Sequence, residues 1–196
     1  MKILGVTGSF GTGKTFVASL FRRLGARVID ADVIAHSVIG KGSPSYRRIV
    51  KVFGRGILLA DGRINRKKLG RIVFSDSRLI KTLNAITHPA VIKIIKERIN
   101  KYKDDAVIII DAPLLVEAKL SGAVDALIVV KCSREKQIER CRKKFGIEKE
   151  EILKRIEKQI PIRRKIKMAD YLIDNSGRRS ETAKQVKKVW KEAAWK

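Results

Sequence analysis

The feature that most constrains this chain is a glycine-rich stretch near its N-terminus, residues 8–15, with the sequence GSFGTGKT. It fits the pattern G-x-x-x-x-G-K-[ST]. An apolar run precedes it and an amphipathic helical pattern follows it, which is the context of a phosphate-binding loop. Its glycines permit a backbone whose successive N–H groups cradle phosphate oxygens at the positive end of the next helix. We expect Lys14 to reach the β- and γ-phosphates and the Thr15 hydroxyl to ligate Mg²⁺.

Two apolar runs that end in acidic residues indicate a ligand-binding edge. Residues 26–29 lead into Asp30-Ala31-Asp32, and the uninterrupted apolar run 107–110 ends in Asp111. Open α/β sheets bind ligands outside the carboxyl ends of their strands, which is where these carboxylates fall. One aspartate of the first pair could instead cap a helix that starts nearby. Asp111 is typical of the acid that supports Mg²⁺, through water, in P-loop proteins.

Strand-like runs alternate with helical segments along the chain. The five candidate strands are residues 3–7, 26–29, 107–110, 126–130 and 171–173. This alternation predicts an α/β fold with right-handed βαβ connections and a mostly parallel sheet. Residues 36–104 are predicted to be mostly helical, with breaks at residues 40–44, 54–56 and 61–62. The length favours a single domain over residues 1–196.

A basic helical pair follows the fourth candidate strand. Ser133 is a predicted N-cap for a helix that carries Gln137 and Arg140, and Pro161 interrupts a second helical run. These helices, residues 137–166, are predicted to form a lid that closes on phosphates. The alternative is a solvated charged face, which is the usual meaning of such runs.

The composition is that of a globular protein, with 44% hydrophobic and 33% charged residues. No apolar run approaches about 20 residues, so we expect no membrane span. The chain begins directly with a candidate strand, so we expect no signal peptide. Cys132 and Cys141 lack the spacing of zinc or redox motifs, which favours reduced thiols in the cytoplasm.

The net charge of +25 leaves two interpretations open. Strong basicity favours polyanionic partners, either nucleic acid or small phosphorylated ligands. A solvated surface rich in Lys, Arg and Glu, as in thermophile proteins, accounts for it equally well. Aromatic residues make up 6% of the chain and do not interleave with the basic ones. Because no nucleic-acid-binding signature accompanies them, we expect no specific nucleic-acid partner, and a nucleic-acid-binding P-loop protein is the competing class.

The ordered landmarks of the chain resemble the dephospho-coenzyme A kinase family over nearly its whole length. They are Thr7–Thr15, Val28–Asp32, Phe53-Gly54, Asp61-Gly62, Asn65-Arg66, Leu83-Asn84, His88-Pro89, Pro113-Leu114-Leu115 with Glu117, Gln137 with Arg140, Gln159, Ala169-Asp170, and Asn175 with Gly177. The resemblance implies a three-layer P-loop kinase fold with a five-stranded parallel sheet, a helical acceptor region at residues 36–104 and a mobile lid. It also implies that MgATP phosphorylates the 3′-hydroxyl of dephospho-CoA, in the final step of coenzyme A biosynthesis.

The same resemblance implies roles for particular residues. Asp32 accepts the proton of the acceptor hydroxyl, and Arg140 stabilises the transferring phosphoryl group together with Lys14. Mg²⁺, bound with the co-substrate ATP, is held by Thr15 and, through water, by Asp111. The residues implied to bind ATP are Gly11, Thr12, Gly13, Lys14, Thr15, Phe16, Asn175 and Gly177, the last two at the adenine.

Acceptor binding is implied for Asp32, Arg66, His88 and Leu115. His88 has a structural alternative, because the residue before a proline can shape the start of a helix. The partners implied are the small molecules ATP and dephospho-CoA, with no membrane and no specific nucleic acid. We expect a cytoplasmic monomer or small homo-oligomer.

Three positions depart from the family pattern. Ser9-Phe10 stands where the family usually has Gly-Ile, which leaves the required loop positions unchanged. Lys143 stands where many members have a second lid arginine. Because lysine gives charge without a bidentate fork, Arg142 is a candidate substitute. Pro161 leaves the course of the helix around it open. A different small-molecule kinase on the same fold is the second alternative.

Overall fold

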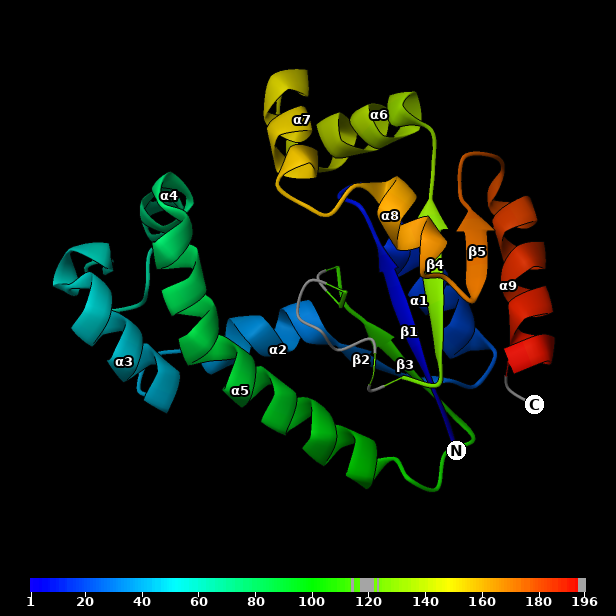
Figure 1. The fold of residues 1–196 in the computed structure, drawn as a ribbon, viewed down its shortest axis with the longest axis horizontal. Coiled ribbons are helices and arrows are strands. Elements are labelled where there is room, and N and C mark those ends of the chain that lie inside the picture. The colour runs from blue at the N-terminus through cyan, green and yellow to red at the C-terminus, as the bar shows by residue number, and fades with distance from the viewer. Residues whose placement is uncertain (114, 117–121, 123, 194–196) are drawn as a thin grey trace. The chain divides into compact units, whose positions relative to one another are not determined.

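The structure of the protein is a computed structural model that describes residues 1–113, 115, 116, 122 and 124–193. The chain divides into two compact units, one of Met1–Asp30 with Lys101–Lys196 and one of Ala31–Asn100. The predicted helical region at residues 36–104 falls almost entirely in the second unit. Figure 1 shows the helices and strands of both units.

The first unit contains one parallel sheet. Its strands are β1 (Lys2–Gly8), β2 (Arg27–Asp30), β3 (Val107–Asp111), β4 (Ala126–Lys131) and β5 (Tyr171–Asp174), in the order β2-β3-β1-β4-β5. Every neighbouring pair is parallel, which confirms the predicted five-stranded parallel sheet. The glycine-rich loop follows β1, the central strand, where the strand order changes direction. Such a switch point is where open α/β sheets bind their ligands.

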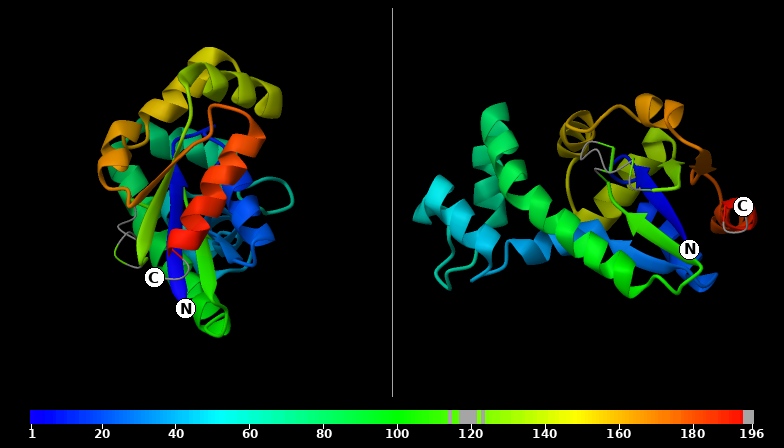
Figure 2. Two further views of the ribbon diagram at one scale, coloured as in Figure 1. Left: turned by 90° about the vertical axis from the view of Figure 1, so that its right-hand side faces the viewer. Right: turned by 60° about the horizontal axis from the view of Figure 1, so that its bottom comes forward.

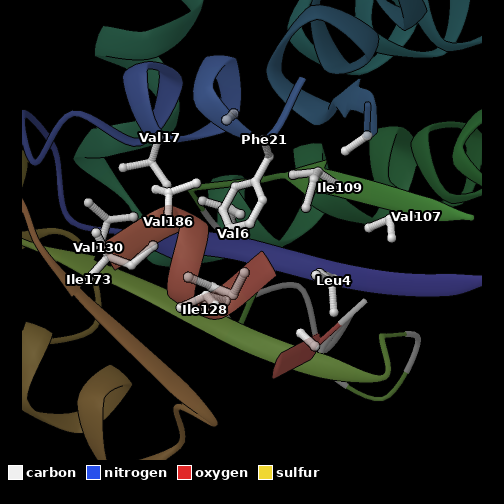
Figure 3. Packing of buried hydrophobic residues seen from close by; sticks show 14 residues of the cluster. Leu4, Val6, Val17, Phe21, Val107, Ile109, Ile128, Val130, Ile173 and Val186 are labelled. Atoms are coloured by element: carbon white, nitrogen blue, oxygen red, sulfur yellow. The ribbon is translucent and has the colours of Figure 1, made fainter. Parts of the chain in front are cut away.

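Side chains that alternate along the strands build the main core of the first unit. Helices α1 (Lys14–Arg23) and α9 (Arg179–Ala193) pack against each other, and their apolar residues join the same core. Figure 3 shows Phe21 and Val186 facing strand residues such as Val6 and Ile128. Strand residues between these, such as Ile108 and Val129, are also buried. Both faces of the sheet are therefore covered, as expected for parallel strands.

Three short helices lie between β4 and β5. They are α6 (Arg134–Phe145), α7 (Lys149–Glu157) and α8 (Ile162–Lys167). The Ser133 hydroxyl accepts a hydrogen bond from the Lys136 N–H, which confirms the predicted N-cap. Pro161 immediately precedes α8, so the predicted interruption is confirmed. Figures 1 and 2 show α6 and α7 beyond the carboxyl ends of the strands.

The second unit is helical, as predicted. Its elements are α2 (Ala31–Val38), α3 (Pro44–Phe53), a 3₁₀ turn at Arg55–Ile57, α4 (Arg66–Ser75) and α5 (Ser77–Lys101). The predicted breaks at residues 40–44 and 61–62 fall between these elements, the one at 54–56 is largely a 3₁₀ turn, and the break between α4 and α5 at Asp76 was not predicted. Its own apolar cluster consists of Ile49, Ile57, Ile64, Leu69, Val73 and Ile86.

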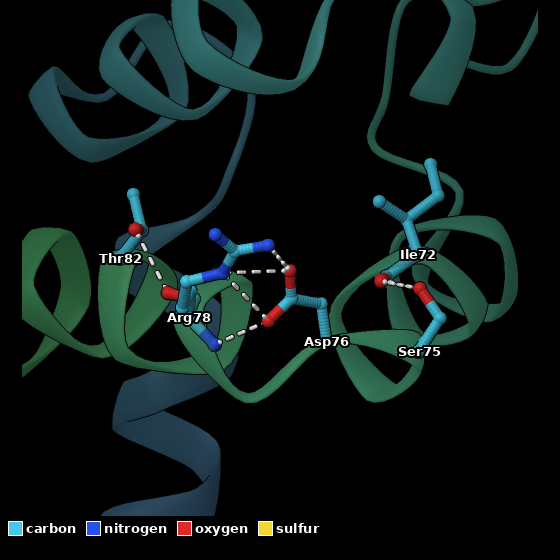
Figure 4. Close-up of polar contacts among 5 residues, drawn as sticks. All are labelled: Ile72, Ser75, Asp76, Arg78 and Thr82. Carbon is cyan, nitrogen blue, oxygen red and sulfur yellow. Dashed lines mark hydrogen bonds and ion pairs between the residues drawn. The ribbon is translucent and has the colours of Figure 1, made fainter.

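Polar contacts organise the ends of α4 and α5. The side-chain oxygen Oδ1 of Asn65 accepts from the Lys68 N–H at 3.0 Å and caps α4. Between the helices, the Asp76 carboxylate accepts from the backbone N–H of Arg78 at 2.8 Å and pairs with its guanidinium at 2.9 Å (Figure 4). Asp76 thereby satisfies an N–H group that the first turn of α5 would otherwise leave unpaired.

One of the two predictions for His88-Pro89, that the pair shapes the start of a helix, is wrong. Helix α5 continues through Pro89. A proline inside a helix removes one backbone hydrogen bond and costs about 3 kcal/mol. Buried residues on both sides of the proline, Ile86 and Val91, offset this cost by removing apolar surface from water.

Among the described residues, no helix is long and apolar enough to span a membrane.

We predict that Phe21→Ala destabilises the first unit strongly. The Phe21 side chain is fully buried, and its ring centroid lies 6.5 Å from that of Trp190. Emptying such a site costs about 3–5 kcal/mol of unfolding free energy. Denaturant unfolding measures the loss, and Leu172→Ala, at an exposed strand position, is the control. A loss below about 1 kcal/mol for Phe21→Ala, well under that range, would contradict this packing.

Candidate active site

Two glycines set the course of the loop between β1 and α1. Gly11 and Gly13 have φ angles of +79° and +88°, a region that residues with a side chain rarely adopt. A Cβ on Gly11 would meet the Cys141 sulfur, and a Cβ on Gly13 would meet the Asn175 amide nitrogen. Glycine is therefore required at both positions by backbone conformation and by space.

Buried hydrogen bonds hold this loop from beneath. The Asn175 side-chain N–H donates to the Thr12 carbonyl oxygen at 2.8 Å, and its oxygen accepts from the Thr182 hydroxyl at 3.0 Å. The Thr12 hydroxyl donates to the Ser9 carbonyl oxygen at 2.9 Å. Asn175, Thr12 and Thr182 are all buried. The Asn175 amide is thus engaged within the protein. The predicted adenine contacts of Asn175 and Gly177 stay predictions.

The helix after the loop begins at Lys14 with its N-terminus open. No side chain among the described residues caps α1, and its first turn holds no acidic residue. The first N–H groups of a helix carry a partial positive charge and attract anions. Thr15, in this first turn, is exposed. The Lys14 ammonium lies 3.3 Å from the Ser9 carbonyl oxygen and adds a full charge to the same loop.

A second cation reaches the loop from α6. The Arg140 Nη1 atom lies 3.5 Å from the position that a Cβ on Gly13 would occupy. This atom is buried and has no hydrogen-bond partner in the described part of the chain. Arg142, the proposed substitute for a second lid arginine, pairs instead with Glu148 at 3.6 Å, and both side chains are largely exposed. Arg140 is thus the α6 arginine that lies against the loop.

Acidic residues meet at the carboxyl edge of the sheet. Asp111 is opposite Val6 in the register of β1 and β3, and opposite Asp30 in that of β2 and β3. The Asp111 side chain is 6% exposed. The Pro113 carbonyl oxygen accepts from the Thr7 hydroxyl at 3.1 Å and from the buried Lys165 ammonium at 2.8 Å. These bonds fix the segment that follows Asp111 to β1 and α8.

The residues present fit Mg²⁺ rather than a metal caged by protein. The described residues contain no group of three or more His, Cys, Asp and Glu side chains that could surround an ion. Mg²⁺ needs no such cage, because it keeps several waters and takes one or two protein oxygens besides substrate phosphates. The exposed Thr15 hydroxyl and the Asp111 carboxylate are oxygen donors of that kind.

The remaining predicted residues are distributed between the two units. Asp32 lies in the first turn of α2, and His88 lies within α5, where burial lowers its pKa and keeps it neutral at pH 7. Leu115, in the first unit, is fully buried. Its predicted contact with the acceptor stays a prediction. Leu114 and Glu117 of the same motif lie outside the described residues.

Arg66 lines a basic cavity of the second unit that the sequence reasoning missed. The cavity has a volume of about 530 Å³ and is lined in part by Lys41, Arg63, Asn65, Arg66 and Lys67. Four cations around one cavity favour an anionic ligand. Lys41 escaped the sequence reasoning because it is separated from the other basic residues by α3, and nothing local marks it. The glutamines Gln137 and Gln159 were noted as landmarks, but no role was assigned to them.

Comparisons with known proteins agree on one family. A sequence profile of dephospho-CoA kinase matches residues 2–181. The dephospho-CoA kinase of Aquifex aeolicus is 47% identical over 192 residues, covering 98% of this chain and 97% of that protein. The solved structure of TT1252 from Thermus thermophilus is similar with a TM-score of 0.87 and 30% identity, covering 97% of each chain. A dephospho-CoA kinase structure from Campylobacter jejuni has a TM-score of 0.70 and 28% identity, covering 98% of this chain and 96% of that chain.

We predict that Cys132, whose sulfur lies 3.9 Å from the Gly11 carbonyl oxygen, resists alkylation. Burial raises the pKa of this thiol to about 11, so little thiolate is present at pH 8. The thiolate is the reactive form, so iodoacetamide should react about a hundredfold more slowly than with free cysteine. The rate should rise steadily as the pH approaches 11. Mass spectrometry of the modified peptide measures this, and alkylation at the rate of free cysteine would contradict the buried environment.

Proposed function

This chain belongs to the dephospho-CoA kinase family, and we propose a role for each site residue in its reaction. It is a kinase that phosphorylates dephospho-CoA with ATP, the final step of coenzyme A biosynthesis. The observation that carries the assignment of roles is the loop of residues 8–15. Its glycine conformations, the uncapped start of α1 and the adjacent Arg140 together form a site for phosphate.

Phosphoryl transfer asks the protein mainly for positioning and for neutralisation of charge. The transition state spreads negative charge over three equatorial oxygens of the transferring group. In our proposal, the N–H groups of residues 11–16 hold the phosphates of ATP, except those of Thr12 and Phe16, which donate to the backbone carbonyl oxygens of residues 9 and 13. Lys14 neutralises the β- and γ-phosphates. Arg140, whose Nη1 atom is buried beside Gly13, donates to the transferring group as its charge develops. Asn175 acts through the loop, because it fixes the Thr12 carbonyl.

Mg²⁺ would be held by the Thr15 hydroxyl and, through water, by Asp111. When bound, Mg²⁺ neutralises the charge on the β- and γ-phosphates of ATP. The task of this chain is to keep the Asp111 carboxylate in place at the end of β3. The hydrogen bonds to the Pro113 carbonyl oxygen support that placement, because they fix the chain two residues beyond Asp111.

The acceptor hydroxyl requires a proton acceptor, and we assign that role to Asp32. It follows the carboxyl end of β2 by two residues, and a carboxylate can orient a ribose hydroxyl and accept its proton. We assign the anionic part of the acceptor to the basic cavity that Arg66 lines. His88, neutral at pH 7, can donate and accept hydrogen bonds in the same unit.

In this proposal the lid predicted at residues 137–166 is formed by α6 and α7, residues 134–157, because α8 is held to the Pro113 carbonyl oxygen by Lys165. A closed lid excludes water, which would otherwise compete with the acceptor hydroxyl for the γ-phosphate. The reaction takes place in the cytoplasm, where reduced cysteines and MgATP are available. Both substrates are small molecules. We therefore interpret most of the excess positive charge as a solvated surface and not as a binding site for nucleic acid.

We predict that Asp32→Asn lowers kcat by about 10²–10⁴, the usual contribution of a general base. The substitution keeps the size of the side chain but removes its charge and its capacity to take a proton. ATP binding should change little, because the triphosphate is held by the loop. Asp30→Asn is the matched control and should have a milder effect. Rates with dephospho-CoA and MgATP are compared at equal folded fraction, checked by thermal unfolding. Retention of more than about a third of the wild-type kcat, far outside that range, would refute the assignment and make Asp30 the next candidate.

We predict that Arg140→Lys lowers kcat more than it raises the KM of either substrate. Lysine keeps the charge but loses the planar fork that a phosphoryl group accepts. Arg142→Lys, at an exposed arginine of the same helix, is the control and should leave both constants unchanged. Steady-state kinetics distinguish the cases. A pure KM effect for ATP would reassign Arg140 to ground-state binding, and unchanged kinetics would remove it from the mechanism.

A further inference from the structure

Two glutamine side chains from the segment that follows β4 form hydrogen bonds with the backbone N–H and the carbonyl oxygen of Phe10. Its N–H donates to the Gln159 side-chain oxygen at 2.7 Å, and the same oxygen accepts from the Ser9 hydroxyl at 3.1 Å. Its carbonyl oxygen accepts from the Gln137 side-chain N–H at 2.8 Å. Gln137 lies in α6 and Gln159 lies between α7 and α8. The backbone of Phe10 therefore faces these helices, and its N–H is committed to Gln159 rather than to a phosphate.

The ring of Phe10 is held by the same helices. It stacks on the ring of Phe145, the last residue of α6, with centroids 5.4 Å apart and planes 22° apart. The Arg155 guanidinium of α7 lies over it at 5.4 Å, and the Lys144 ammonium lies 5.2 Å from the Phe145 ring. Stacked aromatic pairs and cations over aromatic rings are both stabilising contacts. The ring thus joins α6 and α7 to the phosphate-binding loop.

We infer that Phe10 is a positioning residue that couples the phosphate-binding loop to the lid. The loop has two parts with different contacts: residues 9 and 10 attach to α6, α7 and Gln159, while the N–H groups that we assign to the phosphates lie in the part of the loop that follows. Because Arg140 is in α6, one helical turn from Gln137, the attachment holds its guanidinium beside Gly13 before nucleotide arrives. This inference rests on the proposed role of α6–α7 as the lid.

The contacts of the Phe10 side chain depend on its aromatic ring. An aliphatic side chain offers no π face to the Arg155 guanidinium and no ring to stack on Phe145. Phe145 itself is 45% exposed, so its contact with Phe10 is not simply part of a buried core. The attachment is therefore specific to the ring and to the polarity of the two glutamines.

The polarity of the two glutamines gives a matched test. Gln159 accepts from the N–H of Phe10, so Gln159→Glu keeps an acceptor there. Gln137 donates to the carbonyl oxygen, so Gln137→Glu places a carboxylate against that carbonyl and loses the bond. Both variants add one negative charge near the loop, so the electrostatic effect on ATP is shared. We expect kcat to be at least about tenfold lower for Gln137→Glu than for Gln159→Glu, given the cost of an unsatisfied buried polar group.

The ring is tested separately and without substrates. Amide hydrogen exchange across residues 134–157 should become several-fold faster in Phe10→Leu, while exchange in β1, β3 and β4 stays unchanged. Phe10→Tyr keeps the ring and should restore both the exchange rates and kcat. Leu172→Ala, at an apolar residue exposed like Phe145, is the control for general effects of truncation. In Phe10→Leu, kcat should fall more than the KM for ATP rises, because residues 11–16 remain intact.

The outcomes separate this inference from the proposed function. Equal kcat values for the two glutamate variants, or unchanged exchange in α6–α7 of Phe10→Leu, would overturn the coupling. A uniform loss of stability with normal kcat per folded molecule would also overturn it. If Arg140→Lys has no kinetic effect while Phe10→Leu still speeds exchange in α6–α7, the attachment stands and the role of Arg140 fails. If exchange in α6–α7 is unchanged in Phe10→Leu while Arg140→Lys lowers kcat, the role of Arg140 stands and the attachment through Phe10 fails.

Discussion

The whole site depends on how closely the chain passes other segments at Gly11 and Gly13. At these two residues the loop runs against Cys141 of α6 and against Asn175 after β5, leaving no space for a Cβ. The left-handed backbone there leads directly into the start of α1, and the Arg140 Nη1 atom lies beside Gly13. One backbone path therefore connects the central strand, the helix that we propose binds the phosphates and the helix that carries Arg140. Any side chain at either glycine would displace all three.

Charge explains how such a loop serves phosphoryl transfer. The positive end of α1, Lys14 and Arg140 surround one position, and the acids of the first unit meet at the adjoining edge of the sheet, with Asp111 opposite Asp30. We propose that these cations stabilise the phosphates and the transition state, that Asp111 supports the metal, and that Asp32, which belongs to the second unit, serves the acceptor hydroxyl. The excess of 25 positive charges adds a general attraction for anions. It does not by itself select a substrate, which depends on the shape and donors of the acceptor-binding region.

Local patterns predicted most of the fold and the centre of the site. The loop at residues 8–15, the five strands, the Ser133 cap and the break at Pro161 follow from spacing and turn chemistry within a few residues. Contacts between distant segments were not predictable in this way. The pairing of Gln159 with Phe10 spans 149 residues, and that of Asn175 with Thr12 spans 163. The continuation of α5 through Pro89 depends on tertiary burial that outweighs a local signal.

The central claim is that this loop transfers phosphate from ATP to dephospho-CoA, and a coupled assay for ADP tests it most directly. The assay offers dephospho-CoA, adenosine, nucleoside monophosphates and oligonucleotides to the wild-type protein and to Lys14→Ala, each with saturating MgATP. We expect rapid ADP formation with dephospho-CoA alone, and its near abolition in Lys14→Ala, since such a charge supplies several kcal/mol to the transition state. A faster rate with another acceptor, or near-normal turnover by Lys14→Ala, would contradict the account.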